Sequence, residues 1–289
     1  MSAPGAVARP AVERLIRAAL EEDVGDGDRT TAWTVDADAV GRARIIARSP
    51  GIIAGTEPAG RVFAAIDEGV EVAWEGGDGG RVAAGDRIAR LEGPLRSILS
   101  AERVALNFLA RLSGVATLAA RYVEAVAGSG ATIVDTRKTT PGWRRLEKDA
   151  VVAGGATNHR MGLYDMVLIK ENHARACGGI AAALEAVAAG AAREGLEVEV
   201  EVSTLDELEE ALSGEPDRIL LDNMEPAELR VAVARVARSP EPRPLLEASG
   251  GVDLGSVRAV ADTGVDLISV GAITHSAPAL DLSLLVEAP

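Results

Sequence analysis

The sequence predicts an α/β protein in two parts, an α+β domain followed by a parallel sheet that is closed or nearly closed into a barrel. Short apolar runs alternate with helical patterns from about residue 130 onwards, which is typical of parallel strands joined by right-handed helical crossovers. The first 115 or so residues instead show short strands separated by glycine and aspartate turns. No low-complexity linker separates the two parts. We therefore expect an N-terminal domain over residues 1–115 and a barrel over residues 116–275, with a tail of about 276–289 that packs back on the first domain.

The N-terminal part begins with an amphipathic helix over about residues 10–22, because apolar residues recur at helical spacing between Val12 and Leu20. This layout differs from that of a signal peptide, so we expect no export signal. The turn-rich segment GDGDRTT leads into short strands, which are Ala43–Ala47, Ile52–Gly55, Val70–Trp74 and Arg87–Leu91. A long helix, capped by Ser97 or Ser100, then runs towards Ala127.

The stretch GRVAAGDRIARLEG is similar to the small β-sandwich pattern of biotinyl and lipoyl carrier domains. Those carriers present a modifiable lysine at a hairpin tip, but the first lysine of this chain is Lys138. The stretch therefore predicts a sandwich-like domain and excludes carrier function.

The second part contains short apolar strands with helical patterns between several of them. The strands are Thr132–Val134, Met166–Ile169, Val198–Val202, Ile219–Leu221, Leu245–Ala248 and Leu267–Val270. The clearest helical patterns are Ile180–Arg193, Leu205–Leu212, Pro226–Arg238 and Leu254–Thr263. In barrels of this kind the functional site lies at the carboxyl ends of the strands.

Composition limits the classes of ligand. Lysine and arginine number 30 against 44 aspartates and glutamates, and the formal net charge of −14 argues against nucleic-acid binding, which needs a basic face. No apolar run approaches the roughly 20 residues that cross a bilayer, so we expect no membrane association. The single cysteine, Cys177, excludes an intrachain disulfide and fits a cytoplasmic protein. All three lysines lie in one central stretch, at Lys138, Lys148 and Lys170, which indicates either a site for a small anion or a solvated basic helix face.

Polar or glycine-rich residues lie at or directly after the end of every predicted strand of the second part. They are Asp135-Thr136-Arg137-Lys138, Lys170-Glu171-Asn172-His173, Glu201 with Ser203, Asp222-Asn223, Ser249-Gly250-Gly251 and Gly271-Ala272. One or two such segments are ordinary turn chemistry, whereas six at one edge of a barrel predict a binding site.

These residues fall into three chemical groups. The cations, which can bind carboxylates, are Arg137, Lys138, His159, Arg160 and Lys170. The backbone N–H groups that suit a phosphate belong to Ser249-Gly250-Gly251 and Gly271-Ala272. The acids Glu201 and Asp222 suit Mg²⁺ or ribose hydroxyls. Together the groups predict a site for a dicarboxylate, a phosphate and a sugar with a metal.

Each feature also has a plainer interpretation when it is taken alone. Glu199 lies two residues before Glu201 on the same strand face, and a strand glutamate usually faces water, so we assign the functional role to Glu201. Asp222-Asn223 is also a common turn between a strand and a helix, and Gly250-Gly251 is weak evidence without its neighbours. The prediction of a site therefore rests on the combination.

The run DTRKTTPGWRRLEKDAVVAGGATNHRMGLYDMVLIKENH resembles quinolinate phosphoribosyltransferase, also called carboxylating nicotinate-nucleotide pyrophosphorylase. The similarity extends back through ERVALN and EEDVGDGDRTT, and forward through EVEVEV, LLDN, EASGGV and VDLISVGAITHS, so it covers nearly the whole chain. It implies an N-terminal α/β sandwich followed by an open barrel of fewer than eight strands, the type II phosphoribosyltransferase arrangement. The implied reaction, in de novo NAD biosynthesis, converts quinolinate and 5-phosphoribosyl-1-diphosphate to nicotinate mononucleotide, diphosphate and carbon dioxide, with Mg²⁺ as cofactor.

The resemblance also implies roles for individual residues. Quinolinate and the diphosphate would bind to Arg137, Lys138, His159, Arg160 and Lys170. Glu201 and Asp222 would hold the ribose and Mg²⁺ and, with Lys138, form the catalytic group. The 5′-phosphate would lie on Ser249, Gly250, Gly271 and Ala272. The family works as a homodimer with shared sites, so Arg103 in ERVALN would reach into the active site of the neighbouring subunit.

Three other functions remain open on the sequence alone. A paralogous phosphoribosyltransferase-like protein of molybdenum-transport operons would accept another base, which the full set of carboxylate-binding cations disfavours. A non-catalytic ligand sensor would not need Lys138, Glu201 and Asp222 together. A barrel aldolase with a Schiff base at Lys170 would not explain two phosphate loops beside a dicarboxylate site.

Overall fold

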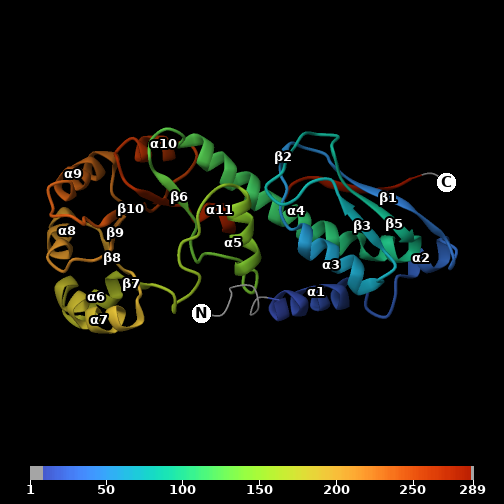
Figure 1. Ribbon diagram of the computed structural model, residues 1–289, viewed down its shortest axis with the longest axis horizontal. Coiled ribbons are helices and arrows are strands. Elements are labelled where there is room, and N and C mark those ends of the chain that lie inside the picture. The colour runs from blue at the N-terminus through green and yellow to red at the C-terminus, as the bar shows by residue number, and fades with distance from the viewer. Residues whose placement is uncertain (1–8, 288–289) are drawn as a thin grey trace. The chain divides into compact units, whose positions relative to one another are not determined.

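The computed structural model describes residues 9–287, which form two compact units (Figure 1). The first unit comprises the described residues up to Leu118, the segment 140–155, and the residues from Ala277 onwards. The second unit comprises Ala119–Thr139 and Ala156–Ser276. The segment 140–155, which the sequence analysis assigns to the barrel, therefore belongs to the first unit.

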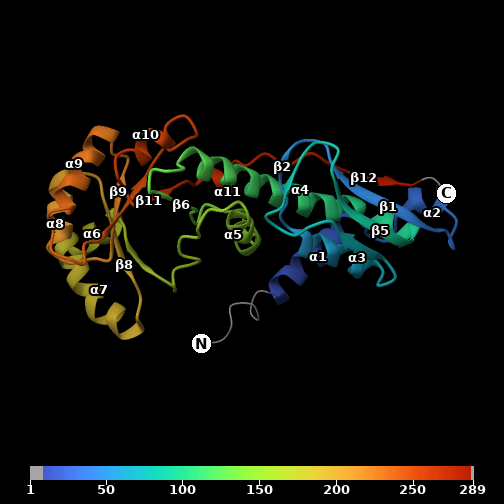
Figure 2. The same ribbon diagram turned by 45° about the horizontal axis from the view of Figure 1, so that its top comes forward.

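The first unit is built on a four-stranded antiparallel sheet in the order β12-β1-β5-β3. Its strands are β1 (Val40–Ala47), β3 (Glu71–Trp74), β5 (Arg87–Pro94) and β12 (Leu282–Val286), and a separate short pair is formed by β2 (Gly51–Ile52) and β4 (Arg81–Val82). Strand β12 lies beside β1 with Leu284 opposite Ile45, which joins the last described residues to the N-terminal sheet (Figure 2). Pairing with β12 also satisfies the backbone groups of β1 that an edge strand would leave exposed.

The helices of the first unit cover this sheet and its core. They are α1 (Arg9–Asp23), α2 (Arg29–Thr34), α3 (Thr56–Ile66), α4 (Leu95–Ala125), which continues into the second unit, and α5 (Arg144–Ala153). Helix α5 joins this unit through polar and aromatic contacts with α4. Arg111 donates to Glu147, which is fully buried, at 2.9 Å, and the Phe108 ring stacks on Trp143 with centroids 4.7 Å apart. These contacts explain why 140–155 separates from the barrel residues on either side of it in the chain.

Helix α4 begins earlier than its predicted caps. It starts at Leu95, so Ser97 and Ser100 lie inside its first two turns. Ser97 donates from its hydroxyl to Asp67 at 2.7 Å, and Ser100 donates to Asp28 at 3.1 Å. The two serines therefore form tertiary hydrogen bonds instead of capping the helix.

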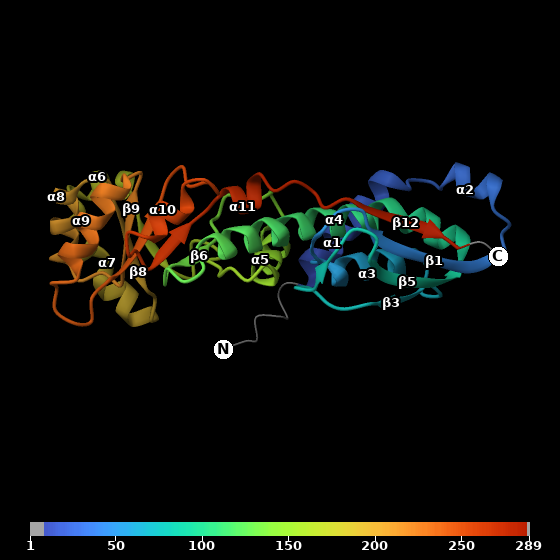
Figure 3. The same ribbon diagram turned by 90° about the horizontal axis from the view of Figure 1, so that it is seen from above.

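The second unit contains a six-stranded parallel sheet in the order β6-β11-β10-β9-β8-β7 (Figures 1 and 3). Its strands are β6 (Thr132–Val134), β7 (Val167–Ile169), β8 (Val198–Val202), β9 (Arg218–Asp222), β10 (Leu245–Ser249) and β11 (Leu267–Ser269). Strands β6 and β7 are the two ends of this order and are not paired with each other, so the barrel is open. The predicted open parallel α/β barrel after an N-terminal α/β domain is thus confirmed.

Helices lie outside the parallel sheet and connect its strands (Figure 1). They are α6 (Glu171–Cys177), α7 (Ile180–Glu194), α8 (Leu205–Leu212), α9 (Pro226–Val236) and α10 (Val257–Ala261). The short helix α11 (Ala272–His275) follows the last parallel strand, β11. Helix α10 is shorter than predicted because Asp253 accepts the N–H groups of Gly255 and Ser256 in a turn before it. In residues 9–287 no single helix is long and apolar enough to cross a membrane. Only α6 and α7 taken together reach the necessary length and apolar composition, and the pair is bent by 92°.

Candidate active site

A cavity of about 400 Å³ lies at the carboxyl ends of the parallel strands, within the second unit. Its lining comes from all six strands, the residues just after them, and the segment between α5 and β7: Asp135, Thr136, Arg137, Lys138, His159, Arg160, Leu168, Lys170, Glu201, Leu220, Asp222, Glu247, Ser249 and Ser269. Parallel strands place their carboxyl ends at one edge, so segments that are far apart in the sequence converge here. The cavity contains eight of the residues that the sequence analysis assigns to the site, which are Arg137, Lys138, His159, Arg160, Lys170, Glu201, Asp222 and Ser249.

Positively charged side chains crowd one part of this cavity. Arg137 and Lys138 follow β6, Lys170 follows β7, and Arg160 lies in the segment between them. Burial, and then the charge of Arg137, lowers the pKa of the Arg160 guanidinium, although an arginine stays protonated in proteins. Cations that repel one another in the free protein gain free energy when a polyanionic ligand lies among them, so this part of the cavity suits a carboxylate or phosphate.

Two carboxylates face these cations from adjacent strands. Glu201 accepts a hydrogen bond from the Lys170 ammonium at 2.5 Å, and Asp222 accepts one from the Asn223 side chain at 2.7 Å. Burial, and then the charge of Glu201, raises the pKa of Asp222. A site in which one carboxylate opposes the ionisation of its neighbour favours a divalent cation, and oxygen donors are the ligands that Mg²⁺ prefers.

The loop after β10 is fixed by the loop after β9. The N–H of Asn223 donates to the carbonyl of Ser249 at 2.8 Å, and Asn223 itself has a left-handed backbone with φ of 56°. Gly250 has φ of +101°, and a Cβ atom there would lie 2.1 Å from Asn223 Oδ1. Only glycine fits at this position, and without a side chain its backbone can closely approach a ligand.

The loop after β11 lies against the loop after β6. Thr274 donates from its hydroxyl to the carbonyl of Lys138 at 2.9 Å, and a Cβ atom on Gly271 would lie 3.0 Å from the Lys138 side chain. Gly271 directly precedes α11, which begins at Ala272. These contacts bring the second predicted phosphate loop next to Lys138, although Gly271 and Ala272 do not line the cavity.

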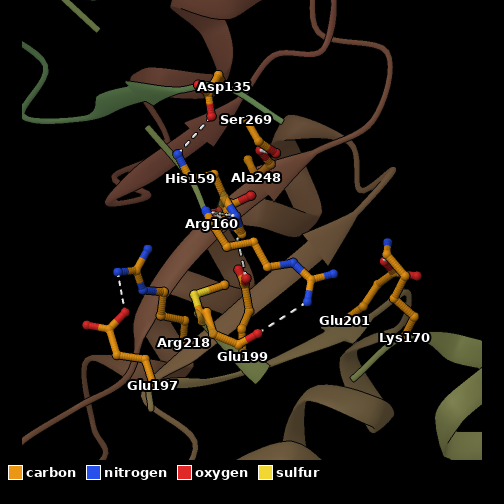
Figure 4. A network of polar contacts seen from close by, with 12 residues as sticks. Asp135, His159, Arg160, Lys170, Glu197, Glu199, Glu201, Arg218, Ala248 and Ser269 are labelled. Carbon is orange, nitrogen blue, oxygen red and sulfur yellow. Dashed lines mark hydrogen bonds and ion pairs between the residues drawn. The ribbon is translucent and has the colours of Figure 1, made fainter. Parts of the chain in front are cut away.

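Beneath the cations lies a buried cluster that the sequence analysis did not predict (Figure 4). His159 Nε2 is 3.0 Å from Glu199 Oε2 and 3.3 Å from Glu247 Oε2, and both glutamates are almost fully buried, with exposures of 0% and 1%. The expectation that Glu199 faces water is therefore wrong, because the face of β8 that carries Glu199 and Glu201 is the interior of the barrel. The sequence signal for Glu247 was a charged residue inside the otherwise apolar strand Leu245–Ala248.

Burial and close charges shift pKa values within this cluster. Burial of the His159 ring favours its neutral form, but hydrogen bonds and charges from Glu199 and Glu247 outweigh burial and raise the pKa of His159 to about 9. Burial raises the pKa of Glu199 as well. The backbone N–H of Arg160 points at His159 Nδ1 at 2.8 Å, so a proton on that nitrogen would face another donor. The contact at Nδ1 therefore favours a ring whose hydrogen lies on Nε2.

Arg103, which the resemblance assigns to the site of a neighbouring subunit, belongs to the first unit. It is exposed on α4 within the first unit. Within one chain it does not line the cavity.

An open parallel barrel whose strand ends gather cations, paired carboxylates and glycine loops defines the class of barrel enzymes that bind phosphorylated, carboxylate-bearing substrates. Family models for the N-terminal and C-terminal domains of quinolinate phosphoribosyl transferase match residues 28–113 and 115–285. The chain therefore belongs to the quinolinate phosphoribosyltransferase family.

Curated relatives and a solved structure agree with this assignment. The chain is 44% identical over 93% of its length to a nicotinate-nucleotide pyrophosphorylase [carboxylating] of Mycobacterium leprae, of which it covers 95%. It is 41% identical over 94% of its length to a quinolinate phosphoribosyltransferase [decarboxylating] of Nicotiana tabacum, of which it covers 81%. The structure of the nicotinate-nucleotide pyrophosphorylase of Francisella tularensis superimposes with a TM-score of 0.91 at 42% identity, covering 96% of each chain.

Proposed function

We propose that this chain is a decarboxylating quinolinate phosphoribosyltransferase, a pentosyltransferase of NAD biosynthesis. It would join quinolinate to 5-phosphoribosyl-1-diphosphate and release nicotinate mononucleotide, diphosphate and carbon dioxide. The observation that carries the proposal is the convergence of four cationic side chains and the pair Glu201 and Asp222 in one cavity of a chain that belongs to this family.

The cations would bind and orient the dicarboxylate. Arg137 and Arg160 can each bind a carboxylate with two parallel hydrogen bonds, and Lys138 and Lys170 add positive charge to the same cavity. Held in this way, the ring nitrogen of quinolinate faces the ribose C1. Its lone pair forms the new bond to C1 while the C1–oxygen bond breaks and the diphosphate leaves with that electron pair.

Glu201 and Asp222 fit the role of metal and ribose ligands. Both present carboxylate oxygens at the ends of adjacent strands, and the raised pKa of Asp222 reflects negative charge that a cation would relieve. They would hold Mg²⁺, which supplies positive charge beside the departing diphosphate. Lys138, which reaches the same cavity, would stabilise the negative charge that develops on the leaving group.

Decarboxylation needs no further catalytic group in this scheme. Once its nitrogen is bonded to C1, the ring is cationic and accepts the electron pair of the bond to the 2-carboxylate. Carbon dioxide leaves, and the ring carbon takes a proton from water. The 5′-phosphate of the product would lie on the backbone amides of Ser249, Gly250, Gly271 and Ala272, where Gly250 and Gly271 have no Cβ to block its approach.

The same proposal includes a homodimer with shared active sites, in which Arg103 of one subunit completes the site of the other. An exposed arginine on α4 that does not line the cavity of its own chain supports this role. We also propose a cytoplasmic location, which the single, unpaired cysteine Cys177 supports.

Turnover with quinolinate, phosphoribosyl diphosphate and Mg²⁺, followed as nicotinate mononucleotide, tests the proposal. Nicotinic acid serves as the alternative base in a parallel reaction. Product from quinolinate alone, with carbon dioxide released in equal amount, is the expected result. A folded protein that makes no product from quinolinate contradicts it and favours the paralogue or the sensor. Omission of Mg²⁺ should abolish turnover if Glu201 and Asp222 act as described.

A further inference from the structure

Two buried glutamates, Glu247 in the wall of the cavity and Glu199 near it, have no role in the reaction described above. Glu199 on β8 and Glu247 on β10 both lie beside His159, and Figure 4 shows Glu199 there. Some of their oxygens, Glu199 Oε1 and both oxygens of Glu247, have no hydrogen-bond partner. Burying two carboxylates costs free energy that apolar side chains would not, so their presence points to a function beyond packing.

The His159 ring is held at both of its nitrogens. Nε2 contacts Glu199 and Glu247, and Nδ1 accepts a hydrogen bond from the backbone N–H of Arg160 at 2.8 Å. The backbone N–H of His159 itself donates to Asp135 at 2.8 Å. Because Nδ1 is an acceptor, the hydrogen of the neutral ring lies on Nε2 and is donated to Glu199, with Glu247 beside it.

The same contacts distinguish a metal site from a hydrogen-bonded cluster that orients His159. The donor atoms of His159, Glu199 and Glu247 lie within 4.8 Å of one another, a spacing that could hold a metal ion. A metal on Nε2 would move the ring hydrogen to Nδ1, where it would face the N–H of Arg160. An N–H at Nδ1 and the N–H of Arg160 would repel each other at 2.8 Å. The contacts therefore favour a hydrogen on Nε2 over a metal ion there.

We propose that Glu199 and Glu247 are positioning residues, which hold His159 by its Nε2–H and through it fix the backbone of Arg160. Arg160 has little freedom of its own, since it is 9% exposed and its Nη1 donates to the Met166 carbonyl at 3.3 Å. A rotation of the His159 ring would break the contact with the Arg160 N–H and move the guanidinium. The substrate named here, quinolinate, rests on the proposed function.

Substitution of each glutamate by leucine and by glutamine separates this role from packing. Glu199→Leu removes the acceptor for Nε2–H, and Glu247→Leu removes the second carboxylate beside it. The dissociation constant for quinolinate should rise by about 10- to 100-fold, the loss of one charged hydrogen bond. Glu199→Gln keeps an acceptor oxygen and should restore much of that affinity. The affinity for phosphoribosyl diphosphate should not change, and KM for quinolinate should rise more than kcat falls.

Val200→Ala is the matched control. Val200 lies beside Glu199 on the same strand, is fully buried, and points away from the barrel interior. It should lower the thermal stability without changing the affinity for quinolinate. If the leucine variants fail to fold, the comparison of Glu199→Gln, Glu247→Gln and the double glutamine variant with wild type still applies, because loss of both charges should weaken quinolinate binding more than either loss alone.

Nitrogen NMR of the protein labelled with ¹⁵N-histidine gives a readout that is independent of the substrate. The chain has three histidines, so His173→Gln and His275→Gln assign the His159 signals. Wild type should show His159 with hydrogen on Nε2, and the double leucine variant should lose this signature, whereas the double glutamine variant keeps acceptor oxygens and should retain it. An unchanged His159 spectrum together with unchanged quinolinate affinity in the double leucine variant would overturn the proposal, as would Zn²⁺ binding at His159 that depends on both glutamates. If wild type neither binds nor converts quinolinate, the proposed function fails while the spectra still decide the positioning role.

Discussion

At Arg160 two opposing electrostatic effects meet. Burial and the charge of Arg137 lower the pKa of its guanidinium, whereas Glu199 and Asp165 raise it. Arg160 is thus a buried cation that lines the cavity and has Glu199 and Asp165 as negatively charged neighbours. This arrangement is expected of a group that binds an anion, because the ligand then relieves the repulsion from Arg137.

Removal of Arg137 or Arg160 should therefore act on substrate binding. Arg137→Ala or Arg160→Ala should raise KM for quinolinate by roughly 10- to 100-fold, since a bidentate charged contact contributes about 1.5–3 kcal/mol. Arg145→Ala is the control, because Arg145 forms an exposed pair with Asp149 on α5. Steady-state kinetics with quinolinate as the varied substrate measures the effect. Unchanged kinetics in either variant would remove that arginine from the site.

Gly250 and its neighbour Gly251 provide a test position and a control in the loop after β10. Both have positive φ, but a Cβ on Gly250 would collide with Asn223, whereas a Cβ on Gly251 meets nothing within 4 Å. Gly251→Ala should cost about 1 kcal/mol of backbone strain. Gly250→Ala should lower Tm more and also weaken binding of phosphoribosyl diphosphate. Equal Tm values for the two variants would show that the loops do not interlock as described.

Asp222 makes stability depend on pH. Burial, and then Glu201, raises its pKa above the ordinary value of 3.8, so the folded protein binds this proton more tightly than the unfolded chain. The contribution to stability is complete below that ordinary value and is lost as pH rises through the folded pKa. Asp222→Asn should therefore raise Tm of the ligand-free protein at neutral pH. Thermal melts of both proteins from acidic to neutral pH check this. If Tm of Asp222→Asn fell with rising pH as steeply as Tm of wild type, the assignment would be contradicted. Exposed Asp262→Asn is the control.

Among the elements, α2 shows how local chemistry and tertiary contacts combine. Asp28 caps this short helix by accepting the N–H of Thr31 at 2.9 Å, and its second oxygen accepts from the hydroxyls of Thr31 and Ser100. The side-chain hydrogen bond from Thr31, with the backbone and Ser100 bonds, lowers the pKa of Asp28. One carboxylate thus joins the start of α2 to the first turns of α4.

Loss of this cap should destabilise the N-terminal domain. Asp28→Ala should lower the free energy of unfolding by about 1 kcal/mol, the usual cost of a lost N-cap. Because the pKa of Asp28 is lowered in the folded state, its contribution is present above 3.8 and is lost as pH falls through the folded pKa, so the difference from wild type should shrink in acid. Denaturant unfolding at neutral and acidic pH measures this. Asp38 is exposed, so Asp38→Ala should have little effect on the free energy of unfolding. If Asp28→Ala lowered the free energy of unfolding equally at both pH values, the assignment would be contradicted.

Strand β8 shows where an alternating pattern needs tertiary information. Its valines, Val200 and Val202, are buried against the outer helices, and its glutamates occupy the other face. In an open antiparallel sheet that second face would be solvated. Here the sheet curves into a barrel, so Glu199 is buried and Glu201 lines the cavity.

For the whole molecule, the proposed homodimer predicts complementation between subunits. Arg103→Ala and Glu201→Gln should each be nearly inactive alone, because each removes a group from every active site. Mixed dimers of the two variants should regain activity, since one of their two sites then contains both wild-type residues. Activity after co-refolding of the two variants measures this, with each variant refolded alone as the control. Absence of any recovery in verified mixed dimers would contradict a shared site.

The sequence by itself determined the chemistry of the strand ends and the class of fold. Alternation of apolar runs with helical patterns is a local property, and all six barrel strands lie where it predicts them. Eight predicted site residues, from Arg137 to Ser249, meet in one cavity because parallel strands always end at the same edge.

Only the tertiary structure decided which of the remaining residues are buried and which unit they join. Helix α5 leaves the barrel for the first unit because Glu147 and Trp143 find their partners on α4. Glu199 and Glu247 became neighbours of His159 only when β8 and β10 curved around the same interior. Burial and pairing of this kind depend on contacts between residues distant in the chain, and a local pattern carries no information about which distant surface covers it.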